Sequence, residues 1–343
     1  MGMDTRPANP GATKGDVTRP RTGQVLAGSG LVRALSPSRP VAIVLALLSL
    51  AVLIALPWLL TGFWTRVLTS VFMFAALAQS LNIIAGFVGR ADFGNIVYFG
   101  LGAYTTGFFV LAAVPFPLGI AAAALLAALI ATLIGLPVLR LKGHYFAIAT
   151  IGIMEGTRQL VNNADFLGGG SGMVLPILGL EPAVFNRIVY FAMFGLMVGY
   201  TAIVYRMARG SFGYELRAIK ADEQAAAVMG INTTRAKTTA WAMSAGGSAI
   251  VGGVYALWFG FISPESVFNI VMGTEYFIMM LVGGAGTVMG PIVGAVIIEL
   301  LTVTVWANFV HGHLAILGLA IVLVVVFIPN GVVPTVRRWV LRR

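Results

Sequence analysis

Ten apolar segments follow one another along this chain after a polar start. They lie near residues 41–61, 68–85, 95–114, 117–139, 144–162, 188–206, 238–260, 269–284, 288–307 and 313–329. An α-helix needs about 20 apolar residues to cross the hydrocarbon core of a bilayer. The pattern therefore predicts an all-α polytopic membrane protein with about ten transmembrane helices. The segments beginning at 144 and 269 are the weakest, because they are short or carry ionisable groups.

A polar interruption at residues 207–237 separates two of these apolar segments. Within it, charges stand at Glu215, Arg217, Lys220, Asp222 and Glu223, and they are followed by Gln224, the small residues Ala225, Ala226 and Ala227, and then Gly230. Because alanine favours a helix and glycine ends one, we predict a short charged helix that stops at Gly230. The alanines would form a smooth ridge flanked by charges. Such a helix suits docking into a groove on another protein.

The composition also indicates an integral membrane protein, since 59% of the residues are hydrophobic and only 10% are charged. Soluble domains carry about 25% charged residues. We therefore expect one transmembrane domain over residues 41–330. Residues 1–40 are basic, rich in Pro, Gly, Ser and Thr, and without an apolar period, which predicts a disordered tail. Residues 331–343 form a second basic tail, and the lack of cysteine excludes disulfides.

The net charge of +10 is explained by membrane topology rather than by nucleic-acid binding. Cytoplasmic loops of membrane proteins carry an excess of Lys and Arg. With ten crossings and both termini in the cytoplasm, Arg66 and Arg187 are the basic residues left outside, and Arg158 lies within a span. Merging the segments at 269 and 288 into one would send four C-terminal arginines outward. Ten crossings are therefore preferred, and they place the loop at 207–237 in the cytoplasm.

Glycines interrupt the apolar pattern in two places. The first place holds Gly86, Gly89 and Gly94, and the second holds Gly283, Gly284, Gly286, Gly290 and Gly294. Discontinuous helices often frame the binding site of a transporter. Small residues also let helices pack closely, and this second interpretation accounts for most of the glycines.

The polar interruption resembles the coupling loop of ABC importer permeases, in which Glu-Ala-Ala is followed after three free positions by Gly. Gln224-Ala225-Ala226 and Gly230 have this spacing, with Gln in place of Glu. Stretches at 81–104, 140–172, 260–266 and 283–291 extend the resemblance, in the same order, over roughly residues 67–300. The chain thus resembles the M-type permease subunit of branched-chain amino-acid ABC importers, a family that includes urea and short-chain amide permeases.

This resemblance implies a multi-pass protein of the inner membrane in a larger importer. The partners would be a second permease subunit, two ATP-binding subunits and an extracytoplasmic solute-binding protein. The chain carries no phosphate-binding loop, so ATP and Mg would be bound by the partners and no cofactor by this chain. No catalytic or metal site is expected, since His311 and His313 lack further ligands. The residues expected to couple the permease to the ATPase are Glu215, Arg217, Asp222, Glu223, Gln224, Ala225, Ala226 and Gly230.

Polar residues within the spans are candidates for the translocation pathway, because unpaired charges at the bilayer centre cost about 2.5–3.5 kcal/mol. Glu155 and Arg158 share one helix face. They form either a structural pair or two separate contacts for a zwitterionic substrate. Glu275 lacks a partner nearby in sequence, and Glu299 is expected to snorkel to the interface. The candidates are Asn82, Tyr104, Glu155, Arg158 and Glu275.

Two other classes of protein remain alternatives. A secondary transporter would explain polar residues in the spans, but it would not need the ridge of small residues in a cytoplasmic loop. A membrane enzyme would need a catalytic cluster, and no such cluster stands out in the sequence. Branched-chain amino acids, other amino acids, urea and amides all remain possible substrates.

Overall fold

The computed structural model describes residues 51–141, 143–176, 179–308, 318 and 331–342. Within them, six helices are long and apolar enough to cross a membrane: Gly62–Val88, Phe93–Leu111, Phe116–Val138, Pro182–Arg209, Thr233–Phe259 and Pro264–Gly283. A shorter apolar helix spans Gly290–Val305. The prediction of an all-α polytopic membrane protein is therefore confirmed. The predicted tail at 1–40 and nearly all of the span at 313–329 lie outside the described residues, as do His311 and His313.

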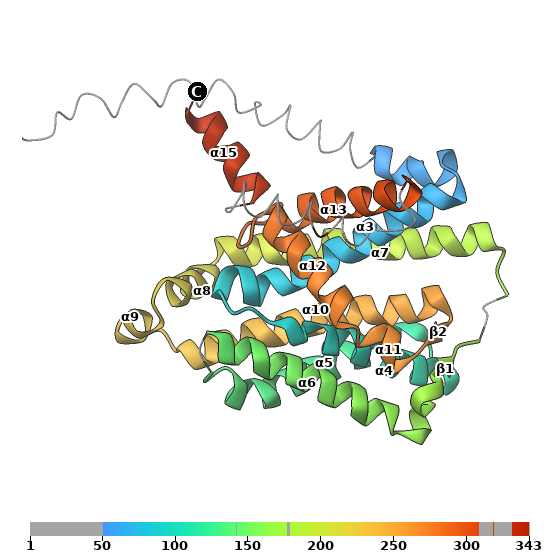
Figure 1. The fold of residues 1–343 in the computed structure, drawn as a ribbon, viewed down its shortest axis with the longest axis horizontal. Helices are drawn as coiled ribbons and strands as arrows, with labels where there is room; N and C mark the ends of the chain where they lie inside the picture. Colours follow the sequence, from blue (N-terminus) through green and yellow to red (C-terminus); the bar gives the residue numbers. More distant parts are fainter. Residues whose placement is uncertain (1–50, 142, 177–178, 309–317, 319–330, 343) are drawn as a thin grey trace, which may run out of the picture. The chain divides into compact units, whose positions relative to one another are not determined.

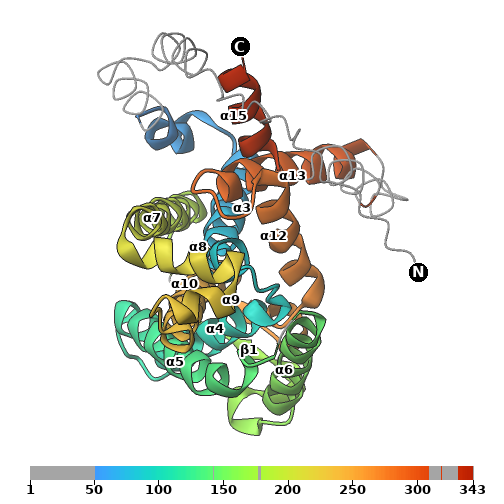
Figure 2. The same cartoon turned by 90° about the vertical axis from the view of Figure 1, so that its left-hand side faces the viewer.

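Helix α3 (Gly62–Leu81) runs through the core and continues as a π-helix, η1 (Asn82–Val88). Every residue from 71 to 81 is buried. The helix packs against α7 (Pro182–Arg209), α10 (Thr233–Phe259), α12 (Ile270–Gly283) and α13 (Gly290–Asn308), and Figure 2 shows it among them. Because the residues on all sides of this segment are buried, protein rather than lipid surrounds it.

A second group of helices forms around α10. It contains α4 (Ile96–Leu111), which follows the 3₁₀ turn η2 (Phe93–Asn95), and α5 (Phe116–Val138). Glycines let α4 and α10 approach closely: a Cβ at Gly102 would lie 2.0 Å from the carbonyl oxygen of Ala249, and one at Gly252 would lie 2.0 Å from that of Phe99. These contacts agree with the close-packing interpretation of the glycines.

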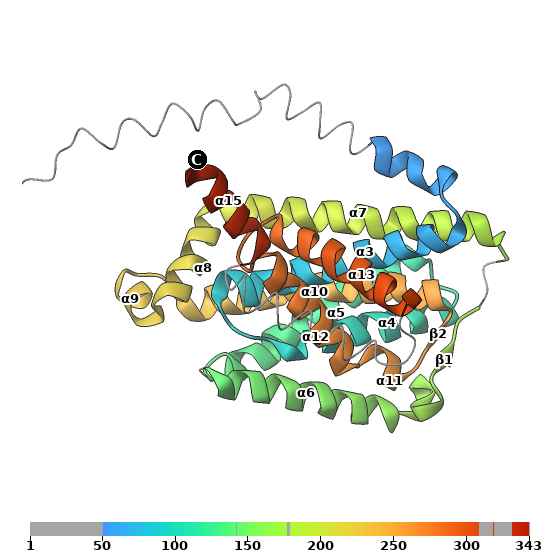
Figure 3. The same ribbon diagram turned by 45° about the horizontal axis from the view of Figure 1, so that its top comes forward.

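Helix α6 (His144–Asn162) matches the predicted segment at 144–162, although it is not among the six helices that are long and apolar enough to cross a membrane. It runs along the lower edge in Figure 3. Two 3₁₀ turns, η3 (Asp165–Leu167) and η4 (Gly169–Ser171), lead from it to strand β1 (Met173–Val174). This strand pairs antiparallel with β2 (Phe261–Ile262), Met173 opposite Ile262, in a small ladder that the sequence did not predict.

The remaining elements are short. Helix α11 (Pro264–Val267) begins with a capping box at Ser263 and leads into α12. The polar interruption folds as α8 (Ser211–Ala221) and α9 (Glu223–Val228). Helix α15 (Val332–Arg342) falls in the predicted C-terminal tail and packs against α12 and α13. Figure 1 shows α8 and α9 at one end of the helices and the β1–β2 ladder at the opposite end.

Candidate functional site: the loop at 207–237 and the adjacent helix breaks

The loop at 207–237 contains two short helices where the sequence predicted one. The chain is extended at Asp222 (φ −157°, ψ 113°), which separates α8 from α9. The Asp222 carboxylate accepts hydrogen bonds from the backbone N–H groups of Gln224 (2.8 Å) and Ala225 (3.0 Å). Asp222 is thus the N-cap of α9. Gly230 follows the end of α9 with a φ of +89°, a conformation that suits glycine, so the predicted helix stop is confirmed.

The exposed surface of α8 and α9 is partly apolar. Tyr214, Val228 and Met229 are 65%, 87% and 81% exposed. Ala225 and Ala227 are also exposed, whereas Ala226 is buried at 4%. The predicted ridge of three alanines is therefore wrong in one respect, because the middle alanine faces the interior of the chain and only its two neighbours face outward.

Glu223 binds two cations from distant parts of the chain. Its carboxylate accepts a hydrogen bond from Arg90 Nη2 at 2.7 Å and another from Lys237 Nζ. Arg90 Nη1 also donates to the carbonyl of Leu141 at 2.7 Å, and Lys237 Nζ lies 3.4 Å from the carbonyl oxygen of Leu139. We call Glu223, Arg90 and Lys237 the charge clamp. It joins the start of α9 to η1, α5 and α10.

The charges in this clamp keep Glu223 ionised. Burial raises the pKa of the carboxyl, but the hydrogen bond and charge of Lys237, together with those of Arg90, outweigh burial and hold the pKa below its usual range. Lys237 is only 4% exposed, so an unpaired ammonium there would be costly. Sequence reasoning listed Glu223 as a handle for the ATPase, whereas here its carboxylate binds groups of its own chain.

Lys220 makes a second connection between the loop and the helices. Its Nζ donates a hydrogen bond to the backbone carbonyl of Gly86, in η1, at 2.7 Å. Burial lowers the pKa of Lys220, which agrees with an ammonium drawn partly out of solvent. Arg217, one turn earlier, donates to the carbonyl of Ala208 at 2.8 Å and lies over the Tyr214 ring.

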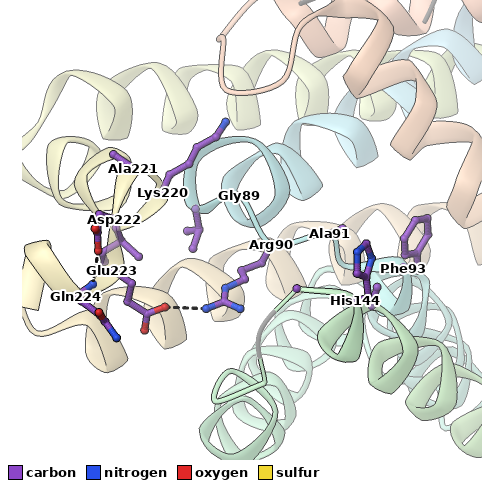
Figure 4. Close-up of a pocket in the computed structure, with 14 residues that line it drawn as sticks. Gly89, Arg90, Ala91, Phe93, His144, Lys220, Ala221, Asp222, Glu223 and Gln224 are labelled. Atoms are coloured by element: carbon purple, nitrogen blue, oxygen red, sulfur yellow. Dashed lines mark hydrogen bonds and ion pairs between the residues drawn. The ribbon is translucent and has the colours of Figure 1, made fainter. Parts of the chain in front are cut away.

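A cleft of about 610 Å³ opens between α8–α9, the end of η1 and the start of α6. Figure 4 shows Arg90 and Glu223 joined across it, with Lys220 and His144 at its walls. Its lining is Val88, Gly89, Arg90, Ala91, Phe93, Gly143, His144, Ala147, Ile219, Lys220, Ala221, Asp222, Glu223 and Gln224. The loop at 207–237 is therefore held by specific contacts and bordered by a cleft.

Asn82 joins the two glycine-rich breaks. Its side-chain Nδ2 donates to the carbonyl of Thr287 at 2.8 Å, and its Oδ1 accepts from the backbone N–H of Gly286 at 2.8 Å. A Cβ at Gly86 would lie 1.9 Å from Asn82 Oδ1, so only glycine fits there. Asn82 is fully buried. It therefore holds η1 against the α12–α13 connection.

Glu155 and Arg158 pair with each other on α6. Arg158 donates from Nε and Nη2 to the two carboxylate oxygens, at 2.9 and 2.6 Å. Gln159 adds a third bond to the same carboxylate at 3.0 Å. The Glu155 and Arg158 side chains are 46% and 29% exposed. The pair thus lies on a side of α6 that the described part of the chain leaves partly exposed.

The other pathway candidates lie deeper. Tyr104 is 3% exposed, stacks on Phe268, and its hydroxyl makes no hydrogen bond within the described part of the chain. Glu275 is half-buried on α12. Glu299 is 8% exposed in the middle of α13, so the prediction that it snorkels is wrong.

The described residues contain no group of three His, Asp or Glu that could hold a metal ion.

Sequence reasoning missed a buried polar network beside η2. Asp92 accepts hydrogen bonds from the Trp241 indole N–H (2.7 Å) and the Gly94 backbone N–H (3.0 Å). Asn95 Oδ1 accepts from the hydroxyls of Ser248 (2.6 Å) and Tyr276 (3.2 Å). The Asp-x-Gly spacing is a turn signal that could have located Asp92. Its partner on α10 lies 149 residues away and leaves no local signal.

Comparison with known proteins gives a family match over most of the chain. The family model described as "Branched-chain amino acid transport system / permease component" matches residues 63–327. The chain is 29% identical to the high-affinity branched-chain amino acid transport system permease protein LivM of Salmonella typhimurium, over 84% of this chain and 74% of the relative. It is 28% identical to LivM of Escherichia coli, over 85% and 74%.

A more distant similarity covers a smaller part of the molecule. The autoinducer 2 import system permease protein LsrC of Salmonella paratyphi B is 25% identical over 53% of this chain and 55% of its own length. No solved structure matches this chain. The family match covers every membrane-spanning helix listed above except one residue of the first. The chain therefore belongs to the family of permease components of branched-chain amino acid transport systems and is a multi-pass protein of the inner membrane.

Proposed function

We propose that this chain is one of two permease subunits of an ATP-driven importer and that an ATPase subunit docks on α8 and α9. The observation that carries this proposal is the coupling loop: it is fastened to its own helices by Lys220 and Glu223, yet exposes Tyr214, Val228 and Met229. Solvent-exposed apolar side chains beside small residues suit a groove on a partner. Two ATP-binding subunits would supply ATP and Mg.

The proposed topology has ten crossings with both termini in the cytoplasm. The separation of α8–α9 from the β1–β2 ladder, visible in Figure 1, agrees with a cytoplasmic coupling loop and an extracytoplasmic ladder. The count of Lys and Arg supports this orientation. An external solute-binding protein would then deliver substrate on the side of η3, η4 and the ladder.

The proposed substrates are branched-chain amino acids. Of the relatives named above, the two LivM proteins match the largest share of this chain, and their names state branched-chain amino acid transport. Urea or short-chain amides are the alternative within the same family. Glu155, Arg158 and Glu275 are retained as candidates for the pathway shared with the second permease. Asn82 and Tyr104 are enclosed by their own chain, so we do not place them in the pathway.

Helix α6 is the proposed lining of that pathway. It buries Phe146, Thr150, Met154 and Val161 against its own chain. Its other side carries the Glu155–Arg158 pair. A helix with polar groups on the side away from its own subunit needs water or another subunit there, since lipid would leave those groups poorly solvated.

Uptake into proteoliposomes tests the proposal. Vesicles containing this chain, a second permease and the ATPase subunits, with solute-binding protein outside, should accumulate labelled leucine only when ATP is inside. Labelled urea in parallel vesicles tests the alternative substrate. Uptake driven by a proton gradient in vesicles that hold this chain alone would instead favour a secondary transporter.

A further inference from the structure

Lys220 lies in a slot whose walls are glycines from both helix breaks. A Cβ at Gly89 would lie 3.0 Å from Lys220 Cγ, and one at Gly286 would lie 3.7 Å from Lys220 Nζ. Both glycines have a φ of +79°, which other residues rarely adopt. The side chain therefore passes from α8 into the junction between η1 and the α12–α13 connection, where a side chain at position 89 would crowd it and one at position 286 would contact it.

The acceptor of Lys220 is a carbonyl that the π-helix leaves free. At the end of η1, the backbone N–H groups of Gly89 and Arg90 both donate to Ile84. The Gly86 carbonyl therefore lacks the Arg90 N–H that an α-helix would supply, and Lys220 donates to it instead. A cation at a helix C-terminus is also favoured by the helix dipole. Lys220 thus caps the broken end of α3 from another element.

Movement at this point would reach two breaks at once. Asn82, in the same π-helix, is hydrogen-bonded to Gly286 and Thr287, so η1 and the α12–α13 connection are held together. π-Helical segments are rare in proteins, and those that occur often lie at functional sites. The chain of contacts therefore runs from Lys220 to Gly86, and from Asn82 to Gly286.

We propose that Lys220 is a positioning residue of the transport cycle, which passes movement of the coupling loop to the η1 and α12–α13 breaks. This inference rests on the proposed docking of an ATPase on α8 and α9. The charge clamp would hold the loop in place, while Lys220 moves the Gly86 carbonyl and, through Asn82, the second break. ATP hydrolysis would then shift η1 and the α12–α13 connection, and with them the helices that lie beside the pathway.

The test measures the number of substrate molecules transported per ATP hydrolysed in the reconstituted importer. Lys220→Met keeps the length of the side chain and removes the charge and the hydrogen bond. We expect this ratio to fall about tenfold, which corresponds to about 1.4 kcal/mol. Lys220→Arg, which can still donate to Gly86, should recover most of the ratio. A loss of structure alone would lower transport and hydrolysis together and leave the ratio unchanged.

Asn82→Leu supplies a second arm, because it removes both bonds to the α12–α13 connection. If Lys220 and Asn82 act in one chain of contacts, the double variant should lower the ratio no further than the stronger single variant. If Lys220→Met does not assemble, Lys220→Leu gives the same test, because leucine also lacks a charge and a hydrogen-bond donor. An unchanged ratio in Lys220→Met, or in Lys220→Leu where that variant replaces it, overturns the inference. Normal hydrolysis in an importer whose α9 surface has been blocked would instead overturn the docking proposal.

Discussion

Glu223 and Arg90 are separated by 133 residues in sequence, yet the Glu223 carboxylate lies 2.7 Å from the Arg90 guanidinium. The same carboxylate binds Lys237, which is almost fully buried. One acidic side chain in the loop at 207–237 thus neutralises two cations, one that follows η1 and one on α10. The Glu223 carboxylate therefore links the position of this loop to the positions of the helices that carry its partners.

Replacing Glu223 should destabilise the folded protein. Glu223→Gln retains one hydrogen bond at most and leaves the buried Lys237 without an anion, so we expect a loss of about 1.5–3 kcal/mol. Glu215→Gln is the control, because Glu215 makes no ion pair within the described part of the chain. Thermal unfolding of the detergent-purified variants measures the difference.

The pH dependence of this difference follows from the lowered pKa of Glu223. A depressed pKa stabilises the folded state above the ordinary carboxyl pKa of about 4.3, and this stabilisation is lost as the pH falls through the folded pKa. The gap in melting temperature between the original chain and Glu223→Gln should be constant from about pH 8 to 5 and shrink below about pH 4. A gap that widens towards low pH would contradict the clamp.

Gly86→Ala should weaken the hydrogen bonds by which Asn82 holds η1 against the α12–α13 connection. The added Cβ would lie 1.9 Å from Asn82 Oδ1 and 2.5 Å from the Gly286 nitrogen, so one of the Asn82 bonds must be displaced. Overpacking of this kind costs about 1–3 kcal/mol. Gly152→Ala is matched to it, because nothing lies within 4 Å of that position on α6. Equal melting temperatures for the two variants would show that the Asn82 contact between the two helix breaks does not stabilise the fold.

The proposed topology predicts a specific labelling pattern in this cysteine-free chain. Ser171, in η4, and Ser211, at the start of α8, are both exposed. In intact cells whose outer membrane has been permeabilised, an impermeant thiol reagent should react with Ser171→Cys and not with Ser211→Cys. Both should react after the inner membrane is opened. Equal reaction of the two sites in sealed cells would be incompatible with ten crossings and cytoplasmic termini.

Exchanging Glu155 and Arg158 separates a pathway role from a structural one. The two side chains pair through two hydrogen bonds, and a mutual pair survives exchange. If both also face a zwitterionic substrate, the exchange reverses the local field, and we expect labelled uptake to fall about tenfold, equivalent to about 1.4 kcal/mol. Expression must be unchanged for this interpretation. Near-normal uptake would remove the pair from the pathway.

Much of the fold could be predicted from local pattern alone. The spans at 117–139 and 144–162 agree with α5 and α6 to within a residue, because apolar runs and the breaks between them are local signals. Gly230 was recognisable as a helix stop for the same reason. The split at Asp222 was not predicted, although an Asp followed by Glu and Gln is an N-cap signal.

The tertiary contacts could not be predicted in this way. The sequence shows Arg90, Lys220 and Lys237 only as positive charges on the cytoplasmic side. Their partners, Glu223 and the Gly86 carbonyl, are fixed by helix packing, and two of the three connections join residues more than 130 positions apart. Burial of Ala226 depends likewise on how α9 lies against α10 and could not be read from an alanine run.

Docking of an ATPase on α8 and α9 is tested most directly by hydrolysis in the reconstituted importer with Ala225→Glu. Ala225 is exposed on α9, so a charged side chain there should block a close-fitting groove without disturbing the chain beneath, and Ala225→Ser is the matched control. We predict that Ala225→Glu assembles its own helices normally but loses substrate-stimulated ATP hydrolysis, while Ala225→Ser retains it. Full stimulated hydrolysis by Ala225→Glu would contradict the assignment of this loop.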